Sequence, residues 1–270
     1  MNRLEGKQIT INYGERDIIK NLDVSIPDKK VTSIIGPNGC GKSTLLKALS
    51  RILNVAHGEV VLDGKNIHQQ PTKEVAKKIA ILPQSPDVAD GLSVFELISY
   101  GRFPYQKGFG RLTQLDHQEI EWAMRVTGTT DFKDKNVNDL SGGQRQRVWI
   151  AMALAQKTDI IFLDEPTTYL DISHQLEILE LVRDLNEQEN CTIIMVLHDI
   201  NQAVRFSDHI IAMKDGNIIE QGDTMNVLTK DVLEEVFNID AELSVDPRNG
   251  KPILVTYDLL CKHYSRDSDE

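Results

Sequence analysis

The sequence predicts an α/β fold with a mostly parallel core sheet, an N-terminal antiparallel β-subdomain and an α-helical insertion. Alternating apolar residues at 9–13 and 22–26 are typical of antiparallel strands. The continuous apolar run within 159–166 is typical of a strand buried on both faces of a parallel sheet. Helical patterns separate it from similar runs at 31–36 and 191–197, and this alternation predicts the α/β class.

Composition limits the classes of protein to which the chain can belong. The formal net charge is −11 over 270 residues, so the basic footprint of a nucleic-acid-binding protein is missing, although a local basic patch can exist within an acidic total. No apolar run approaches the roughly 18 residues of a membrane helix, and we expect no export signal. Cys40, Cys191 and Cys261 are far apart, which argues against a disulfide framework or a zinc site and for a reducing compartment.

The remaining elements follow from local patterns. Residues 58–67 predict an edge strand with an Asp-Gly turn, and residues 209–223 predict a hairpin with an Asp-Gly tip. The pattern over 84–158 is mostly helical, so we expect the helical subdomain at about 86–158. The polar and charged end, 265–270, is expected to be disordered.

The stretch GPNGCGKST matches the phosphate-loop pattern G-x-x-x-x-G-K-[ST], between a predicted strand and a helix. Its backbone N–H groups can surround a β-phosphate, while Lys42 supplies positive charge to the phosphate oxygens and Ser43 offers a hydroxyl to Mg²⁺. A glycine-rich turn formed by chance is the alternative, which this context disfavours. The predicted core is therefore that of a P-loop NTPase. The loop residues expected to bind ATP are Gly36, Pro37, Asn38, Gly39, Cys40, Gly41, Lys42, Ser43 and Thr44.

Two carboxylates follow the buried strand. Asp164 stands at its carboxyl end, where it can hold Mg²⁺ through water beside the phosphate loop. Successive strand side chains point in opposite directions, but at the strand end the backbone can turn Glu165 inward as well. Two solvated charges at a strand end are the alternative.

Cys40 has two interpretations. It lies next to a helix N-terminus and Lys42, which both favour a thiolate; a reactive Cys40 would be alkylated, and MgATP would protect it. The alternative, which we favour, is a small residue that fills space.

The stretch LSGGQ, at 140–144, opens a helix and contains two glycines that need a reason. Ser141 and Gln144 form a predicted capping box. Gly142 and Gly143 each cost roughly 1 kcal/mol relative to alanine inside a helix. Because helix N-termini favour anions, these glycines indicate an anion that approaches bare N–H groups. The rest of this helix has an amphipathic pattern.

LSGGQ, the phosphate loop and LDEPT together resemble the nucleotide-binding subunit of an ATP-binding-cassette (ABC) transporter, from Tyr13 to about Gln221. The resemblance implies an ABC ATPase domain at 1–245 and a short tail at 246–270. It also implies that Tyr13 stacks on the adenine of ATP.

The resemblance assigns further roles. Glu165 is implied to position or deprotonate the attacking water, and His198 to contact the γ-phosphate. The residues implied to act in catalysis are Glu165, His198, Lys42 and Gln84, and those implied to hold Mg²⁺ are Ser43, Gln84 and Asp164. Taken alone, Tyr13 also fits a half-buried strand aromatic, and His198 a satisfied histidine at a strand end.

In this family two cassettes close head to tail, so that LSGGQ of one meets the ATP bound to the other. The anion at the glycines is then the γ-phosphate of the partner's nucleotide. The residues implied to contact ATP in trans are Ser141, Gly142, Gly143, Gln144 and Asp171.

Finer features resemble the branch that imports iron–siderophore complexes, haem or cobalamin. These features are the stretch at 95–106, Trp149 and Tyr169. They imply a homodimer on the cytoplasmic face of the cell membrane, working with an integral permease and an extracytoplasmic substrate-binding protein or lipoprotein, and without nucleic acid. They favour ferric siderophores as cargo and leave haem and cobalamin open.

The stretch 84–109 is expected to form the groove that receives a permease helix. The residues expected in the subdomain core are Val94, Leu97 and Ile98, and those expected to touch a permease are Phe103 and Tyr105.

A soluble ABC ATPase is the non-transport alternative. Those of DNA repair or translation usually carry long coiled-coil insertions or two cassettes, which this sequence lacks. ATPases of iron–sulfur cluster assembly are single short cassettes and stay open. A catalytically dead regulatory cassette is disfavoured because Lys42, Glu165 and His198 are all present.

Overall fold

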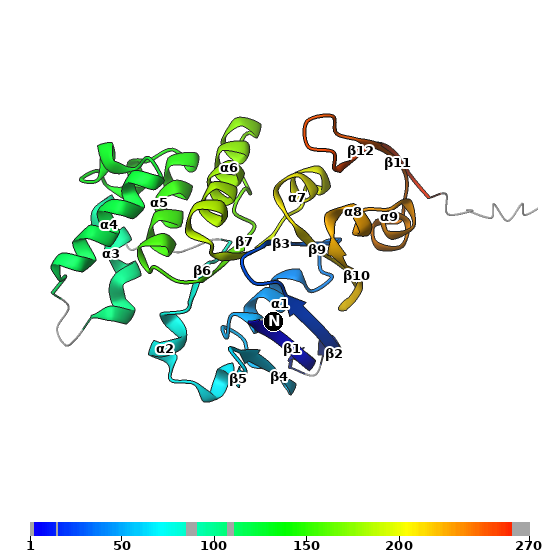
Figure 1. Ribbon diagram of the computed structural model, residues 1–270, viewed down its shortest axis with the longest axis horizontal. Coiled ribbons are helices and arrows are strands. Elements are labelled where there is room, and N and C mark those ends of the chain that lie inside the picture. Colours follow the sequence, from blue (N-terminus) through cyan, green and yellow to red (C-terminus); the bar gives the residue numbers. More distant parts are fainter. Residues whose placement is uncertain (1–2, 15, 85–90, 107–110, 261–270) are drawn as a thin grey trace, which may run out of the picture.

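The computed structural model describes residues 3–14, 16–84, 91–106 and 111–260. A mixed sheet with helices around it lies beside a smaller antiparallel sheet (Figure 1). This arrangement confirms the α/β fold class. Cys261 and the charged end at 265–270 lie outside the described residues.

The smaller sheet has the strand order β2-β1-β4-β5. Its strands are β1 (Leu4–Tyr13), β2 (Arg16–Ile26), β4 (His57–Leu62) and β5 (Lys65–Asn66). All of its pairs are antiparallel, as the alternating pattern predicts. Ile9 and Ile11 are fully buried, whereas Tyr13, the last residue of β1, is 52% exposed.

The larger sheet has the order β10-β9-β3-β8-β7-β6. Its strands are β3 (Val31–Ile35), β6 (Ile79–Leu82), β7 (Ile160–Asp164), β8 (Thr192–Val196), β9 (His209–Lys214) and β10 (Asn217–Asp223). Only β10 pairs antiparallel, in the hairpin with β9. Every residue of β3, β7 and β8 is buried, which confirms the prediction from their continuous apolar runs.

Helices cover the larger sheet and extend beyond it. They are α1 (Lys42–Leu49), α2 (Thr72–Ala76), α3 (Val94–Ser99), α4 (Gln114–Val126), α5 (Gly142–Ala155), α6 (Ile172–Glu189), α7 (Ile200–Phe206), α8 (Thr224–Val227) and α9 (Lys230–Phe237), with 3-10 turns η1 (Ile67–Gln69), η2 (Tyr100–Tyr105), η3 (Thr130–Phe132) and η4 (Val137–Asp139). Within the described part of the chain, every helix is too short or too polar to cross a membrane.

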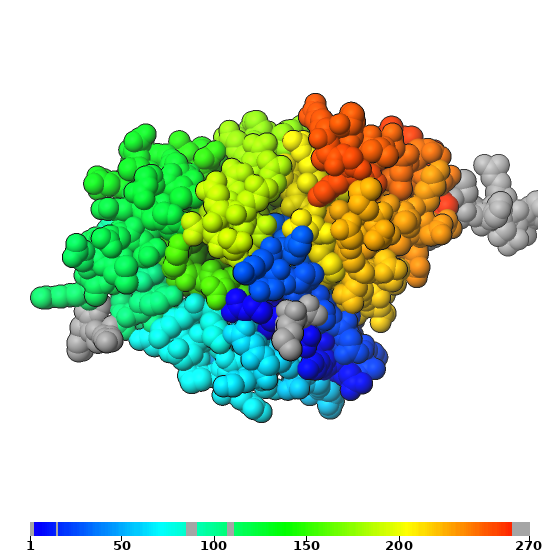
Figure 2. All heavy atoms as spheres, in the orientation of Figure 1, coloured from blue at the N-terminus to red at the C-terminus, as the bar shows by residue number. Residues whose placement is uncertain are grey.

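Helices α3, α4 and α5 stand together at one end of the molecule, opposite a C-terminal hairpin of β11 (Ile239–Val245) and β12 (Pro252–Leu259) (Figures 1 and 2). Val94, Leu97 and Ile98 are buried there, as predicted. The domain limit expected after residue 245 falls between the two strands of the hairpin.

Helix α5 is buried more widely than its amphipathic pattern predicts. Its residues from Val148 to Ala151 are all buried, and so are Ala153 to Ala155. The helix packs against α3, α4 and β6, so several of its sides face other elements. The apolar face predicted from the sequence was therefore too narrow.

A buried ion pair holds the helical end together. Arg102, in η2, is 2% exposed and donates to Asp116 Oδ1 and to the Ala155 carbonyl, both at 2.8 Å. Asp116 also caps α4 by accepting hydrogen bonds from the backbone N–H and hydroxyl of Thr113. Three elements therefore depend on one pair of charges.

We expect Asp116→Ala to lower the free energy of unfolding by about 3–5 kcal/mol, because Arg102 is left buried without its carboxylate. Urea denaturation followed by circular dichroism measures this. The matched control is Asp134→Ala, at an exposed position, which should change the value by less than about 0.5 kcal/mol. Equal effects of the two substitutions would contradict the structural role of the pair.

Candidate functional site

The loop after β3 is shaped by Gly36 and Lys42. Gly36 has φ 150°, and a Cβ there would lie 2.2 Å from the Met213 carbonyl oxygen, so a larger residue does not fit. Lys42 Nζ donates to the carbonyls of Gly36 and Pro37 at 3.0 and 2.9 Å. The loop therefore curls around the ammonium group at the start of α1.

Strand β7 places Asp164 beside the first turn of α1. Ser43 Oγ donates to Asp164 Oδ1 at 2.8 Å. Burial raises the pKa of Asp164, although the hydrogen bond from Ser43 and the charge of Lys47 oppose this. A hydroxyl and a carboxylate are the oxygen donors that suit Mg²⁺, which binds through one or two carboxylates, waters and substrate phosphates. The pair therefore fits Mg²⁺ that is bound together with nucleotide phosphates.

The Glu165 carboxylate is held from three sides. Gln84 Nε2 and Thr168 Oγ1 both donate to its Oε2, the latter at 3.0 Å. His198 Nε2 lies 2.7 Å from its Oε1. Glu165 has φ 54°, a left-handed conformation that breaks the alternation of β7. Glu165 therefore turns inward as well as Asp164.

One cavity of about 430 Å³, a volume typical of small-molecule sites, lies among these segments. Its lining residues are Tyr13, Ile18, Asn38, Gly39, Gly41, Lys42, Ser43, Thr44, Gln84, Glu165 and His198. Most of the residues predicted to bind or hydrolyse ATP thus meet in one place, and Ile18 was not predicted. Gly36, Pro37 and Cys40 do not line the cavity.

Cys40 is 3% exposed and belongs to the hydrophobic core below the loop. Burial raises the pKa of its thiol, although the charge of Lys42 opposes this. A thiolate is therefore disfavoured, and the geometry agrees with the space-filling interpretation.

The LSGGQ stretch lies outside the cavity, at the N-terminus of α5. Ser141 Oγ accepts from the Gln144 N–H, and Gln144 Oε1 accepts from the Ser141 N–H, which confirms the predicted capping box. A Cβ on Gly143 would lie 2.5 Å from His174 Cδ2, so the chain itself explains this glycine. A Cβ on Gly142 would lie no closer than 3.8 Å to its nearest neighbour, Leu170 Cδ2, and this glycine is exposed. The packing of the chain itself therefore explains Gly143 and does not explain Gly142.

Asp171 is the N-cap of α6. It contacts the His174 ring, and that ring packs against Gly143 of the LSGGQ stretch. Asp171 accepts from the His174 backbone N–H, His174 Nδ1 and the Ser173 hydroxyl, and these bonds lower its pKa to about 2. Tyr169, two residues earlier, is 93% exposed with φ 63°. Of the residues predicted to act in trans, Ser141, Gly142, Gln144 and Asp171 are exposed near the exposed Tyr169, whereas Gly143 is buried against His174.

Thr168 and His174 were missed in the sequence analysis. The Asp171 cap, three residues before His174, is a local signal for one of His174's contacts. Its contact with Gly143 has no local signal, because the two residues are distant in sequence.

Comparison with known proteins matches the family model described as "ABC transporter" to residues 19–168. The iron(3+)-hydroxamate import ATP-binding protein of Bacillus subtilis is 55% identical over 260 residues, which cover 96% of this chain and 97% of that protein. The ferric enterobactin transport ATP-binding protein of Escherichia coli is 47% identical over 253 residues, 94% and 93% of the two chains. The dimeric structure of a bacterial ABC transporter cassette matches with a TM-score of 0.72 and 32% identity, over 82% of this chain and 98% of that one.

These similarities extend over nearly the whole chain, and they confirm the resemblance that the phosphate loop, LSGGQ and LDEPT indicate. The chain belongs to the ABC transporter family, as an ATP-binding subunit that hydrolyses ATP.

Proposed function

We propose that this subunit works as a homodimer on the cytoplasmic face of the cell membrane and powers the import of ferric siderophores through a permease. The observation that carries the site assignment is the convergence of Gln84, Glu165 and His198 beside the phosphate loop. The cargo rests on the relatives, which are named for iron(3+)-hydroxamate import and ferric enterobactin transport.

In the proposed mechanism each side chain has one task. Lys42 binds the β- and γ-phosphate oxygens, and Tyr13, which lines the same cavity, stacks on adenine. Glu165 orients the attacking water and accepts its proton, since its carboxylate is fixed by Gln84 and Thr168. His198, whose side chain is 46% exposed, can leave Glu165 to stabilise charge on the γ-phosphate.

Mg²⁺ would be held by Ser43 and Asp164, with Gln84 close by. When bound, the ion neutralises charge on the phosphate oxygens.

The dimer is supported by the surface at the start of α5 and α6. Gly142 is open to a partner molecule, Tyr169 is 93% exposed and Ile172 is 76% exposed. Exposed aromatic and aliphatic side chains beside a helix N-terminus suit contact with another protein and its nucleotide phosphate. Ser141, Gly142, Gly143, Gln144 and Asp171 would then complete the ATP site of the partner.

Contact with the permease is supported by η2. Phe103 is 74% exposed although it follows the fully buried Arg102. Tyr105 is half-buried, and the guanidinium carbon of Arg102 lies 4.0 Å from the centroid of the Tyr105 ring. Part of the predicted groove, at 85–90 and 107–110, lies outside the described residues.

An extracytoplasmic binding protein or lipoprotein would deliver the cargo.

We expect Glu165→Gln to bind ATP normally and to lower kcat by at least about 100-fold, because an amide cannot accept the proton. Phosphate release measures turnover, and equilibrium titration with a fluorescent ATP analogue measures binding. The matched control is Glu180→Gln, on the exposed side of α6, which should retain full turnover. Normal turnover by Glu165→Gln would remove this residue from its role.

We expect cells whose only copy is Glu165→Gln to lose uptake of a ferric siderophore and to keep uptake of haem and cobalamin. Uptake of labelled ferric hydroxamate, ferric catecholate, haem and cobalamin is compared with that in Glu180→Gln cells. Loss confined to haem or cobalamin would overturn the siderophore assignment. Unchanged uptake of every compound would favour a soluble ABC ATPase, such as one of iron–sulfur cluster assembly.

A further inference from the structure

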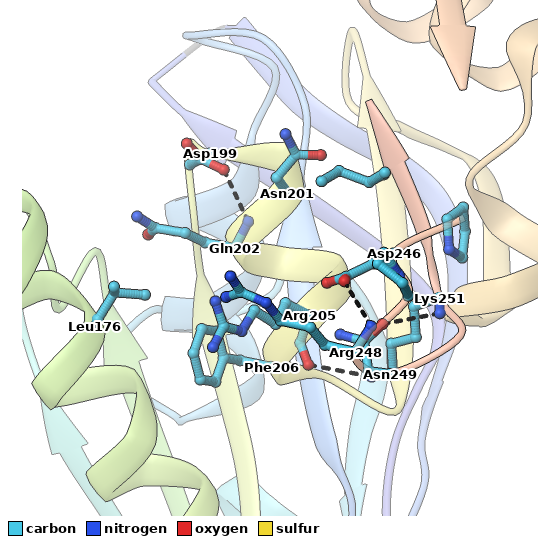
Figure 3. Close-up of a pocket in the computed structure, with 13 residues that line it drawn as sticks. Leu176, Asp199, Asn201, Gln202, Arg205, Phe206, Asp246, Arg248, Asn249 and Lys251 are labelled. Carbon is cyan, nitrogen blue, oxygen red and sulfur yellow. Dashed lines mark hydrogen bonds between the residues drawn. The ribbon is translucent and has the colours of Figure 1, made fainter. Parts of the chain in front are cut away.

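A second cavity, of about 450 Å³, lies away from the ATP site, between α7 and the turn of the β11–β12 hairpin (Figure 3). Leu176 of α6 and Phe206 of α7 supply apolar lining, and Arg205 and Arg248 supply positive charge. Its volume falls within the usual range of about 300–1,000 Å³ for small-molecule sites.

The hairpin is fixed to α7, so the cavity is preformed. The Asn201 side chain donates to the Leu254 carbonyl at 3.0 Å and accepts from the Leu254 N–H at 2.8 Å. Lys251 Nζ donates to the carbonyls of Val204, Arg205 and Ser207 at the end of α7. These contacts place Arg248 of the turn opposite Arg205 of the helix.

Two arginines, Arg205 and Arg248, line this cavity in a chain whose net charge is −11, and Arg183 lies beside the lining residue Phe206. The guanidinium carbons of Arg205 and Arg183 lie 5.0 and 5.6 Å from the Phe206 ring centroid, and Arg248 lines the same cavity. In the described part of the chain, none of the three forms an ion pair or a side-chain hydrogen bond. This is the kind of local basic patch that an acidic total can contain.

Two carboxylates, those of Asp199 and Asp246, also line the cavity, and each accepts a hydrogen bond from a backbone N–H. Asp199 accepts from the Gln202 N–H at 2.8 Å, and Asp246 accepts from the Arg248 N–H at 2.9 Å. Within the described residues, neither carboxylate forms an ion pair with the Arg205 or Arg248 guanidinium. Planar guanidinium groups suit bidentate binding of carboxylate or phosphate.

We propose that this cavity binds a small organic anion. Its carboxylate or phosphate group is held by Arg205 and Arg248, and its apolar part packs on Leu176 and Ile253, which line the cavity. This assignment does not depend on the cargo of the transporter.

An occupant would touch elements that lead to the ATP site. Helix α7 begins two residues after His198 and is capped by Asp199. Gln202 donates to Gln175 at 2.7 Å, and Gln175 donates to the Leu170 carbonyl at 2.9 Å, next to Tyr169. The cavity is therefore placed where a bound metabolite contacts both the helix after His198 and the loop before α6.

The test is isothermal titration of the full chain, with its nucleotide site saturated by ADP. The probes are phenyl phosphate and phthalate, which distinguish phosphate from carboxylate recognition, and benzamide as the neutral control. The variants are Arg205→Gln and Arg248→Gln. The matched control is Arg125→Gln, an exposed arginine on α4 at the opposite end of the molecule (Figure 1). Because Arg248 lies on an exposed turn, its substitution is expected to fold normally.

We expect at least one anion to bind the wild-type protein and Arg125→Gln equally, and to bind Arg205→Gln and Arg248→Gln about tenfold or more weakly. Benzamide should not bind. Failure of both anions to bind, or equal binding to all variants, would overturn the proposal. A change in oligomeric state in Arg248→Gln, without anion binding to the wild-type protein, would assign the cavity to a second copy of the chain and overturn it too.

Discussion

The carboxylate of Glu165 joins three segments that are far apart in the sequence, and the parallel sheet brings them together. Gln84 follows β6, Glu165 follows β7 and His198 follows β8, each within two residues of the strand end. Because β6, β7 and β8 pair in parallel, their carboxyl ends meet at one edge. The position of every one of these side chains is therefore set by the packing of buried strands.

The polar and charged groups of the site form hydrogen bonds and ion pairs with one another in the structure. Glu165 pairs with His198, Ser43 with Asp164, and Lys42 with carbonyl groups of its own loop. In the proposed mechanism Lys42 would bind phosphate oxygens instead, and Ser43 and Asp164 would hold Mg²⁺. Binding of ATP then exchanges polar contacts within a formed cavity, so little backbone order has to be created when the nucleotide arrives.

Much of this arrangement could be predicted from the sequence because its signals are local. The phosphate loop is a continuous motif, and the buried strands are continuous apolar runs, as at 160–164. Contacts between distant segments have no such signal. Three such contacts depend on the tertiary packing. They are the His174 ring beside Gly143, the buried pair of Arg102 and Asp116, and the burial of α5 on several sides.

We propose that two copies of this chain share each ATP, with the phosphate loop of one facing Gly142 of the other. The most direct measurement is the ATPase activity of a mixture of Lys42→Ala and Gly142→Asp proteins. The open space at Gly142 should let Gly142→Asp fold. A mixed dimer contains one intact site, so we expect two nearly inactive proteins to regain turnover when combined. A mixture no more active than the sum of its separate parts would contradict it.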